Sequence, residues 1–452
     1  MKSLSRKVFS IILCLLGLVS VLAGASAPLT GIQLHDGDTV VFCGDSITHQ
    51  CLYTQYVEDY VYTRFPNRRI KLVNAGVSGD RAGDALLRFS EDVAGHQPQV
   101  VTVLLGMNDG QYQHFNHEIF ARYEQDMGYL MDRIAELGAQ TILMGPSMYD
   151  SRVSQTKPPA WVAKDSDQVR QVTRYYYPVL AFYGAWLRDR ASDRGLGYVE
   201  MIQPMSRVTE LARIQNPEFT MIPDAVHPNA NGHAVMAAAM IEQMQLGGWV
   251  GSILLQRAED DTWEIETTHG AAAELVAGDE MGITLRYTAE ALPWVLPKEA
   301  RDGYRRSDAG TRLSRELLRV VGLPTGRYTL SIDQTPVGAY STEQLAGGVE
   351  LQEIETTPQY QQALAVAELN KERNDRVVRP LRDLWLNLRS QRSHPDTPEA
   401  KRAYQAWKSA FDAQCTELER QSQDYVDRIY ATNQPHPRMI RLRPVNPQIE
   451  EK

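Results

Sequence analysis

The sequence predicts an α/β protein in its first half, built on a parallel β-sheet, followed by a small β-rich unit and a C-terminal helical hairpin. Short apolar strands alternate with helical stretches up to about residue 246. This alternation is typical of βαβ units with right-handed crossovers. Three of the strands end in short polar segments that contain glycine. Beyond Trp249 the alternation stops, and short strands and then long helices follow.

The length of the chain and its net charge limit the number of structural units and the kinds of partner that we expect. A chain of 452 residues is longer than one hydrophobic core usually serves, so we expect several units. The predicted division is a signal peptide at 1–27, a first domain at 28–246, a β-rich domain at 247–350, a helical region at 351–432 and an extended tail at 433–452. The net charge of −9 argues against a nucleic-acid partner, since phosphate binding needs a basic surface.

The first residues have the pattern of an export signal. Basic residues precede an apolar run from Val8 to Leu22, and small residues suited to cleavage follow at Ala23-Gly24-Ala25 and Ala25-Ser26-Ala27. An uncleaved membrane anchor is the alternative, but the run is short for a membrane span. We therefore expect a secreted or periplasmic protein with no stable membrane insertion after cleavage.

Cysteine usage gives no disulfide framework. Removal of the signal leaves Cys43, Cys51 and Cys415, an odd number, although a Cys43–Cys51 bridge remains an alternative. We find no cluster with metal-ligand spacing in the sequence, so we expect neither a metal nor a cofactor.

The first domain is predicted to alternate strands and helices. Its strands are expected at 39–44, 69–74, 100–105, 141–144 and 196–200. Its helices are expected at 50–65, 82–93, 120–137, 169–187 and 231–244, with apolar residues at helical spacing. The polar segments Gly44-Asp45-Ser46, Ser78-Gly79-Asp80 and Gly106-Met107-Asn108-Asp109 follow the first three strands. Because the carboxyl ends of parallel strands share one edge of a sheet, these segments should converge there.

The second half reads differently. Short strands are expected at 252–256, 263–267, 283–288, 316–321 and 328–332. A helix over 358–388, interrupted or kinked at Pro380, and a second helix from Pro398 then form an antiparallel hairpin. Three placements of this hairpin remain open: on the β-rich unit, over the functional site, or in a dimer.

Ser46 is the candidate nucleophile, because it follows the first strand at the sheet edge where ligands bind. Ester hydrolysis by a serine also needs a base, a group that orients the base, and donors for the oxyanion. The candidate donors are the backbone N–H groups of Ser46 and Gly79 and the side-chain amide of Asn108. Asp224 and His227 lie three residues apart before the last helix, so a turn can place the carboxylate on the imidazole.

These blocks, in this order, resemble those of the SGNH (GDSL-type) hydrolases over roughly residues 38–245. The resemblance implies a three-layer α/β/α, flavodoxin-like fold with a five-stranded parallel sheet. It also implies Ser46 as nucleophile, Asp224 and His227 as the rest of a triad, and an oxyanion hole formed by Ser46, Gly79 and Asn108. The regions beyond residue 249 have no counterpart in the minimal family domain.

The sequence therefore predicts a secreted serine ester hydrolase that acts through an acyl-enzyme on a small-molecule or saccharide ester. Short acyl groups, above all acetyl groups on a saccharide, are the expected substrates. A lysophospholipase, arylesterase or thioesterase of the same family is the first alternative, and a non-enzymatic cell-surface binding protein is the second. His49, beside the nucleophile, is a further candidate for substrate contact. Oligomeric state is left open.

Overall fold

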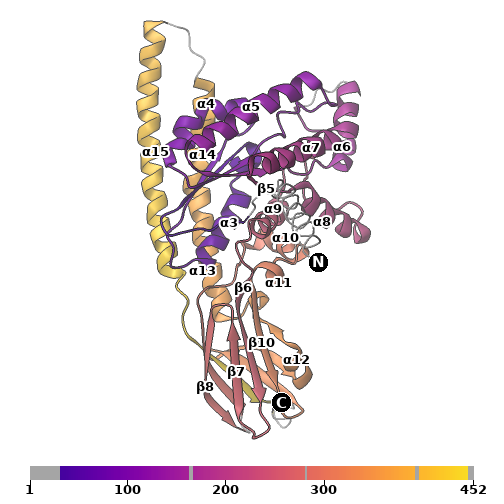
Figure 1. Ribbon diagram of the computed structural model, residues 1–452, viewed down its shortest axis with the longest axis vertical. Helices are drawn as coiled ribbons and strands as arrows, with labels where there is room; N and C mark the ends of the chain where they lie inside the picture. Colours follow the sequence, from indigo (N-terminus) through magenta and orange to yellow (C-terminus); the bar gives the residue numbers. More distant parts are fainter. Residues whose placement is uncertain (1–30, 162–165, 280–281, 392–396, 446–452) are drawn as a thin grey trace, which may run out of the picture.

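The computed structural model describes residues 31–161, 166–279, 282–391 and 397–445, and the predicted signal peptide lies outside them. The first domain is a five-stranded parallel sheet with the strand order β2-β1-β3-β4-β5. Its strands are β1 Thr39–Gly44, β2 Lys71–Gly76, β3 Val100–Leu104, β4 Gln140–Met144 and β5 Gly197–Val199. In Figure 1, α4, α5 and α7 lie on one side of the sheet and α3 and α9 on the other. The predicted three-layer α/β/α fold is confirmed.

The helices of this domain match the apolar periodicity in most places. They are α2 Ser46–His49, α3 Leu52–Arg64, α4 Ala82–Asp92, α5 His117–Glu136, α6 Ser151–Thr156, α7 Ser166–Arg194, α8 Ile202–Gln215 and α9 Ala230–Gln243. The helix expected at 50–65 starts at Leu52, because Cys51 has a left-handed backbone with φ of 63° that separates it from α2. Strand β2 continues to Gly76 because Gly76 pairs with Gly44 of β1. The sequence interpretation missed α8.

Two facing sheets form the β-rich unit. Their strands are β6 Trp249–Arg257, β7 Trp263–Thr268, β8 Ala271–Asp279, β9 Gly282–Ala289, β10 Arg315–Val321, β11 Arg327–Ile332, β12 Thr335–Ser341, β13 Val349–Glu350 and β14 Arg438–Pro444. One sheet has the order β13-β10-β6-β7 and the other β12-β11-β14-β9-β8. The alanine-rich β8 was missed because alanine has a weak preference for strands. Strand β14 comes from the predicted tail and completes the second sheet between β9 and β11.

The segment between β9 and β10 anchors this unit to the first domain. It carries the short helices α10 Arg301–Arg306 and α11 Ala309–Leu313. Trp294 is fully buried, and its indole N–H donates to the carbonyl of Tyr56 over 3.0 Å. Its ring meets the edge of Tyr60, with ring centroids 5.6 Å apart. Burial of the large Trp294 ring against the first domain stabilises the contact between the two units.

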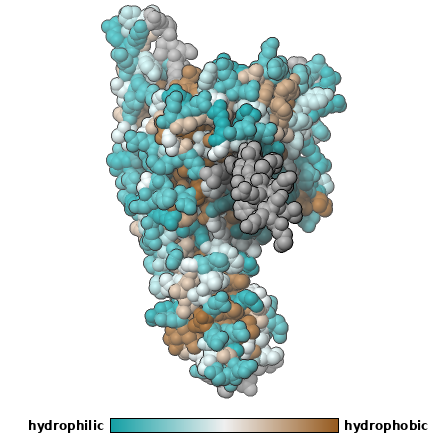
Figure 2. All heavy atoms as spheres, in the orientation of Figure 1, coloured by the Kyte–Doolittle hydropathy of each residue, from teal (hydrophilic) through white to brown (hydrophobic). Residues whose placement is uncertain are grey.

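The C-terminal helices pack on the first domain. They are α13 Pro358–Arg373, α14 Arg379–Gln391 and the long α15 Pro398–Thr432, and α12 Thr342–Gly347 belongs to the β-rich unit. A π-helical turn at Asn374–Val378 joins α13 to α14. It precedes Pro380, whose ring and missing N–H are incompatible with a regular helical turn. The outer face of α15 is largely hydrophilic (Figure 2). None of the described helices is both long enough and apolar enough to cross a membrane.

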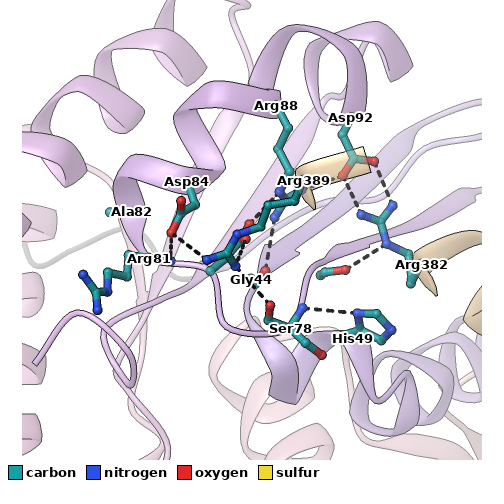
Figure 3. Close-up of polar contacts among 12 residues, drawn as sticks. Gly44, His49, Ser78, Arg81, Ala82, Asp84, Arg88, Asp92, Arg382 and Arg389 are labelled. Carbon is teal, nitrogen blue, oxygen red and sulfur yellow. Dashed lines mark hydrogen bonds and ion pairs between the residues drawn. The ribbon is translucent and has the colours of Figure 1, made fainter. Parts of the chain in front are cut away.

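Buried ion pairs fasten α13 and α14 to the first domain. Arg373 of α13 donates to Glu58 of α3 over 3.0 Å. Arg382 of α14 donates to both carboxylate oxygens of Asp92 in α4, over 2.8 and 2.5 Å. Arg88 also donates to Asp92, over 2.5 Å (Figure 3). The side chains of Asp92 and Arg382 are at most 1% exposed, so this charge cluster is closed to water.

Replacing Asp92 should therefore be strongly destabilising. Asp92→Ala leaves two buried arginines without their shared carboxylate, which should lower the free energy of unfolding by about 3–5 kcal/mol. Urea unfolding followed by fluorescence measures the change. Asp424→Ala, which removes an exposed partner of Arg420 on α15, is the control and should change stability little. Equal effects of the two variants would contradict this account.

Candidate active site

Ser46 lies at the carboxyl end of β1, as the first residue of α2. Only glycine fits at position 44, two residues before Ser46. A Cβ there would lie 2.1 Å from the Thr48 hydroxyl oxygen and 3.0 Å from the Leu104 carbonyl oxygen. Asp45 caps the short helix by accepting the N–H of Ile47 over 3.0 Å. The chain thus turns sharply after the strand, and the Ser46 hydroxyl is left partly exposed at the sheet edge.

His227 and Asp224 meet Ser46 from the loop before α9. His227 Nε2 lies 2.9 Å from Ser46 Oγ, and its Nδ1 lies 2.8 Å from Asp224 Oδ2. The turn that joins them passes through Ala225, which has a left-handed backbone with φ of 73°. The other carboxylate oxygen of Asp224 accepts the N–H groups of His227 and Val226, over 2.7 and 3.0 Å. The carboxylate is therefore held in place by three donors.

The charge on Asp224 follows from these contacts. Burial alone would raise its pKa, but the hydrogen bonds from the His227 ring, the His227 N–H and the Val226 N–H outweigh burial and lower the pKa to about 2. The carboxylate is therefore ionised at neutral pH. An ionised partner holds the proton on His227 Nδ1 and leaves Nε2 free to accept the Ser46 proton.

The structure brings the predicted oxyanion donors to the same edge. Gly79 lies in the loop after β2 and has φ of +79°, a conformation that favours glycine. Asn108 follows β3; its Nδ2 donates to the Asp80 carbonyl over 3.0 Å, and its Oδ1 accepts the Tyr112 hydroxyl over 3.0 Å. The amide nitrogen carries two hydrogens, and the contact with Asp80 needs one of them. These contacts fix the direction of the amide.

Aromatic side chains that the sequence interpretation did not assign border the triad. Trp161 is half-exposed and meets the His227 ring edge-on, with ring centroids 5.7 Å apart. Tyr112 packs between Trp161 and the buried Tyr176, whose ring it stacks on at 4.8 Å. Trp161 thus offers an exposed flat surface beside the His227 ring.

The C-terminal helix α14 also reaches this edge, which no sequence pattern had indicated. His49 is buried rather than open to substrate: its Nδ1 accepts the Ser78 N–H over 3.2 Å, and its Nε2 lies 3.0 Å from Asp383 of α14. Arg389, one turn and a half further along α14, donates to the Ser78 carbonyl and to Asp80, both over 3.2 Å (Figure 3). A charged residue on an amphipathic helix gives no sign in the sequence of which loop it will meet.

Comparison with known proteins identifies the first domain. The model of the GDSL-like lipase/acylhydrolase family matches residues 42–235. The first domain belongs to this family. It is a carboxylic ester hydrolase, and the family that the four sequence blocks indicated is confirmed.

Two similar proteins cover different shares of the chain. An acetylxylan esterase of Geobacillus stearothermophilus is 24% identical over 243 residues, which cover 49% of this chain and 100% of that protein. The solved structure of a gut microbial diltiazem-metabolizing enzyme is 25% identical, with a TM-score of 0.78 over 93% of this chain and 100% of that chain. The first protein corresponds to about half of the chain, whereas the second shares its architecture almost throughout.

The described residues include no group of three or more His, Cys, Asp or Glu side chains arranged to hold a metal ion. Cys43, Cys51 and Cys415 are free thiols, so the alternative Cys43–Cys51 bridge is not formed.

Two buried carboxyl groups lie behind the nucleophile. Burial raises the pKa of Asp45 to about 7, despite the donated N–H of Ile47. Burial also raises the pKa of Asp109 to about 7, although its Oδ1 accepts the Ala82 N–H over 2.9 Å. The charge of Asp45 raises the pKa of Asp109 further, and the charge of Asp80 raises the pKa of Asp45, since like charges in a buried region repel.

Asp109→Asn should stabilise the protein increasingly as the pH rises. The folded chain keeps a proton on Asp109 up to its raised pKa of about 7, whereas the unfolded chain releases it at its ordinary value of about 4. The wild-type protein therefore loses stability across this range, and the amide variant does not. We expect the gain in Tm to be larger at about pH 8 than at about pH 4.5. Asp193→Asn, on the surface of α7, is the control; a gain for Asp109→Asn that is independent of pH would contradict the linkage.

Proposed function

We propose that the chain is a secreted serine esterase that removes short acyl groups, above all acetyl, from a saccharide. The observation that carries this proposal is the hydrogen-bonded line from Ser46 Oγ through His227 to Asp224, with distances of 2.9 and 2.8 Å. An exposed hydroxyl, a base and an orienting carboxylate are the parts that acyl transfer through a serine requires.

In the first half of the reaction, His227 Nε2 takes the proton of the Ser46 hydroxyl while Oγ attacks the ester carbonyl carbon. The carbonyl π-bond opens and its oxygen becomes negatively charged. The N–H groups of Ser46 and Gly79 and the Asn108 amide are the donors for that oxygen. Asp224, ionised because its pKa is about 2, stabilises the imidazolium that forms.

Collapse of the tetrahedral intermediate breaks the bond to the alcohol oxygen, and His227 gives that oxygen its proton. The alcohol leaves, and the acyl group remains on Ser46. Water then attacks the acyl-enzyme, with His227 as base, and the carboxylic acid is released while Ser46 regains its proton. Acylation and deacylation use the same base and the same oxyanion donors, so one arrangement of side chains serves both steps.

The proposed substrate class has two supports. The similar protein that covers one half of the chain is an acetylxylan esterase. The exposed Trp161 beside His227 offers a face on which a sugar ring can stack. The likeness to a diltiazem-metabolizing enzyme over 93% of the chain favours a second candidate, an esterase that accepts small aromatic molecules at the same site.

A panel of esters separates these candidates. We expect the mature protein to hydrolyse 4-nitrophenyl acetate faster than its butyrate and octanoate esters, and to release acetate from acetylated xylan. Ser46→Ala should lower kcat by at least about 10³-fold on each active ester. Ser409→Ala, an exposed hydroxyl on α15, is the matched control and should be unchanged.

Each outcome of this panel is decisive for one part of the proposal. Equal rates for wild type and Ser46→Ala would exclude Ser46 chemistry. Preference for octanoate would exclude the deacetylase version. Turnover of diltiazem without acetate release from xylan would favour the second candidate.

Export is part of the proposal and rests on residues 1–27, where basic residues, an apolar run and small residues follow one another. Expressed in a bacterium with its own leader, the protein should appear in the periplasm or medium, with a new N-terminus after Ala25 or Ala27. N-terminal sequencing checks this. A full-length chain that starts at Met1 and stays with the cytoplasm or membrane would contradict it.

A further inference from the structure

Helix α14 holds both sides of one residue in the loop that carries Gly79. On one side, the N–H of Ser78 donates to His49 Nδ1, whose Nε2 lies 3.0 Å from Asp383. On the other side, the Ser78 carbonyl accepts Arg389 Nη1 over 3.2 Å. Figure 3 shows Arg389 beside this loop, and Ser78 between Arg389 and His49. Two side chains of α14 thus act on the loop, one directly and one through His49.

The peptide group between Ser78 and Gly79 makes this contact relevant to the chemistry. The Ser78 carbonyl and the Gly79 N–H are two ends of one planar trans peptide, so they point in opposite directions. A hydrogen bond that fixes the carbonyl therefore fixes the direction of the N–H. It also polarises the peptide, which strengthens the N–H as a donor by roughly 10–30%.

The loop needs such support because of its own composition. Gly79 is exposed and has φ of +79°, and glycine is the residue with the most backbone freedom to lose. An ideal Cβ on Gly79 would lie 3.4 Å from Arg389 Nη1, so the guanidinium covers this position closely. Gly79 allows the turn, and Arg389 limits the other backbone conformations that this glycine could adopt.

Arg389 also influences Asn108, another predicted oxyanion donor, through Asp80. Its Nη1 lies 3.2 Å from Asp80 Oδ1, and Arg88 holds the other oxygen of that carboxylate over 2.7 Å. The backbone carbonyl of Asp80 in turn accepts Asn108 Nδ2 over 3.0 Å. The position of Asp80 therefore helps to direct the Asn108 amide, whose oxygen is held by the Tyr112 hydroxyl.

We propose that Arg389 is a positioning residue of the oxyanion hole, acting through the Ser78–Gly79 peptide and through Asp80. Helix α14 is then a working part of the active site, supplied by a region outside the family domain. This inference rests on the proposed serine esterase function. Arg389 is not assigned a contact with substrate; its polar contacts in the loop are with protein groups.

The expected kinetic effect follows from the role of the donors. Loss of one oxyanion donor lowers kcat by about 10²–10³-fold, since the charge exists only in the transition state. A donor that is present but poorly directed should cost less, about 10–100-fold in kcat. The KM should stay near the wild-type value, because the ground-state ester does not depend on that donor.

The test compares Arg389→Met, which keeps the side-chain stem and removes every donor, with Arg389→Lys, which keeps one cationic donor group. Arg376→Met is the matched control, because Arg376 lies just before α14 and pairs on the surface with Glu372. The readouts are kcat and KM for 4-nitrophenyl acetate and the inhibition constant of phenylboronic acid, which forms a tetrahedral adduct on a nucleophilic serine. Thermal unfolding of each full-length variant shows whether it is folded.

For Arg389→Met we expect kcat to fall by about 10–100-fold, with KM nearly unchanged and boronate inhibition weakened by a similar factor. Arg389→Lys should lie between this variant and wild type, and Arg376→Met should match wild type. If Arg389→Met failed to fold, Arg389→Lys would still decide, because a compact ammonium on a flexible stem does not keep the fixed direction of the planar guanidinium, whose Nη1 contacts both Ser78 and Asp80.

Wild-type kcat and boronate inhibition in a folded Arg389→Met variant would overturn the inference. A rise in KM alone would overturn it as well, since that result assigns Arg389 to substrate binding. Both outcomes leave the proposed function standing. An unchanged activity of Ser46→Ala would instead remove the serine esterase chemistry on which this inference rests.

Discussion

Asp92 is the group on which the active-site edge of the sheet depends. Its buried carboxylate, on α4, forms ion pairs with Arg88 and Arg382. Arg88 also donates to the Gly44 carbonyl at the end of β1 and to Asp80, and Arg382 donates to the Gly76 carbonyl at the end of β2. One buried charge thus joins the ends of two neighbouring strands to a helix from the other end of the chain.

Such a cluster holds only if every charge is compensated. Moving ions out of water is costly, and the cost is offset where geometry and further hydrogen bonds satisfy the remaining donors. Arg88 contacts two carboxylates and a carbonyl, and Arg382 contacts both oxygens of Asp92 and a carbonyl. We infer that the cluster specifies how α14 docks, more than it adds stability. That docking determines which side chains of α14 reach the loop around Gly79.

The C-terminal regions are consequently not an appendage to the esterase domain. The similar acetylxylan esterase corresponds to about half of this chain, so that protein lacks a counterpart of these regions. In this chain, however, α14 covers the loop after β2, and β14 returns from α15 to complete a sheet of the β-rich unit. The β-rich unit and the helices are thereby closed into one body with the first domain, through Trp294 on one side and Arg373 on the other.

The parallel sheet and the four blocks that meet at its edge could be predicted from the amino-acid sequence. Both are local in origin: apolar periodicity marks the strands, and the shared direction of parallel strands brings Ser46, Gly79 and Asn108 together. The Asp224–His227 turn is local as well, since the two residues are three apart. The contacts of Asp383 and Arg389 could not be predicted, because these residues lie more than 300 positions beyond the loop they hold and reach it only in the folded chain. Charged residues on an amphipathic helix look alike in sequence, and the face that docks selects which of them become part of the site.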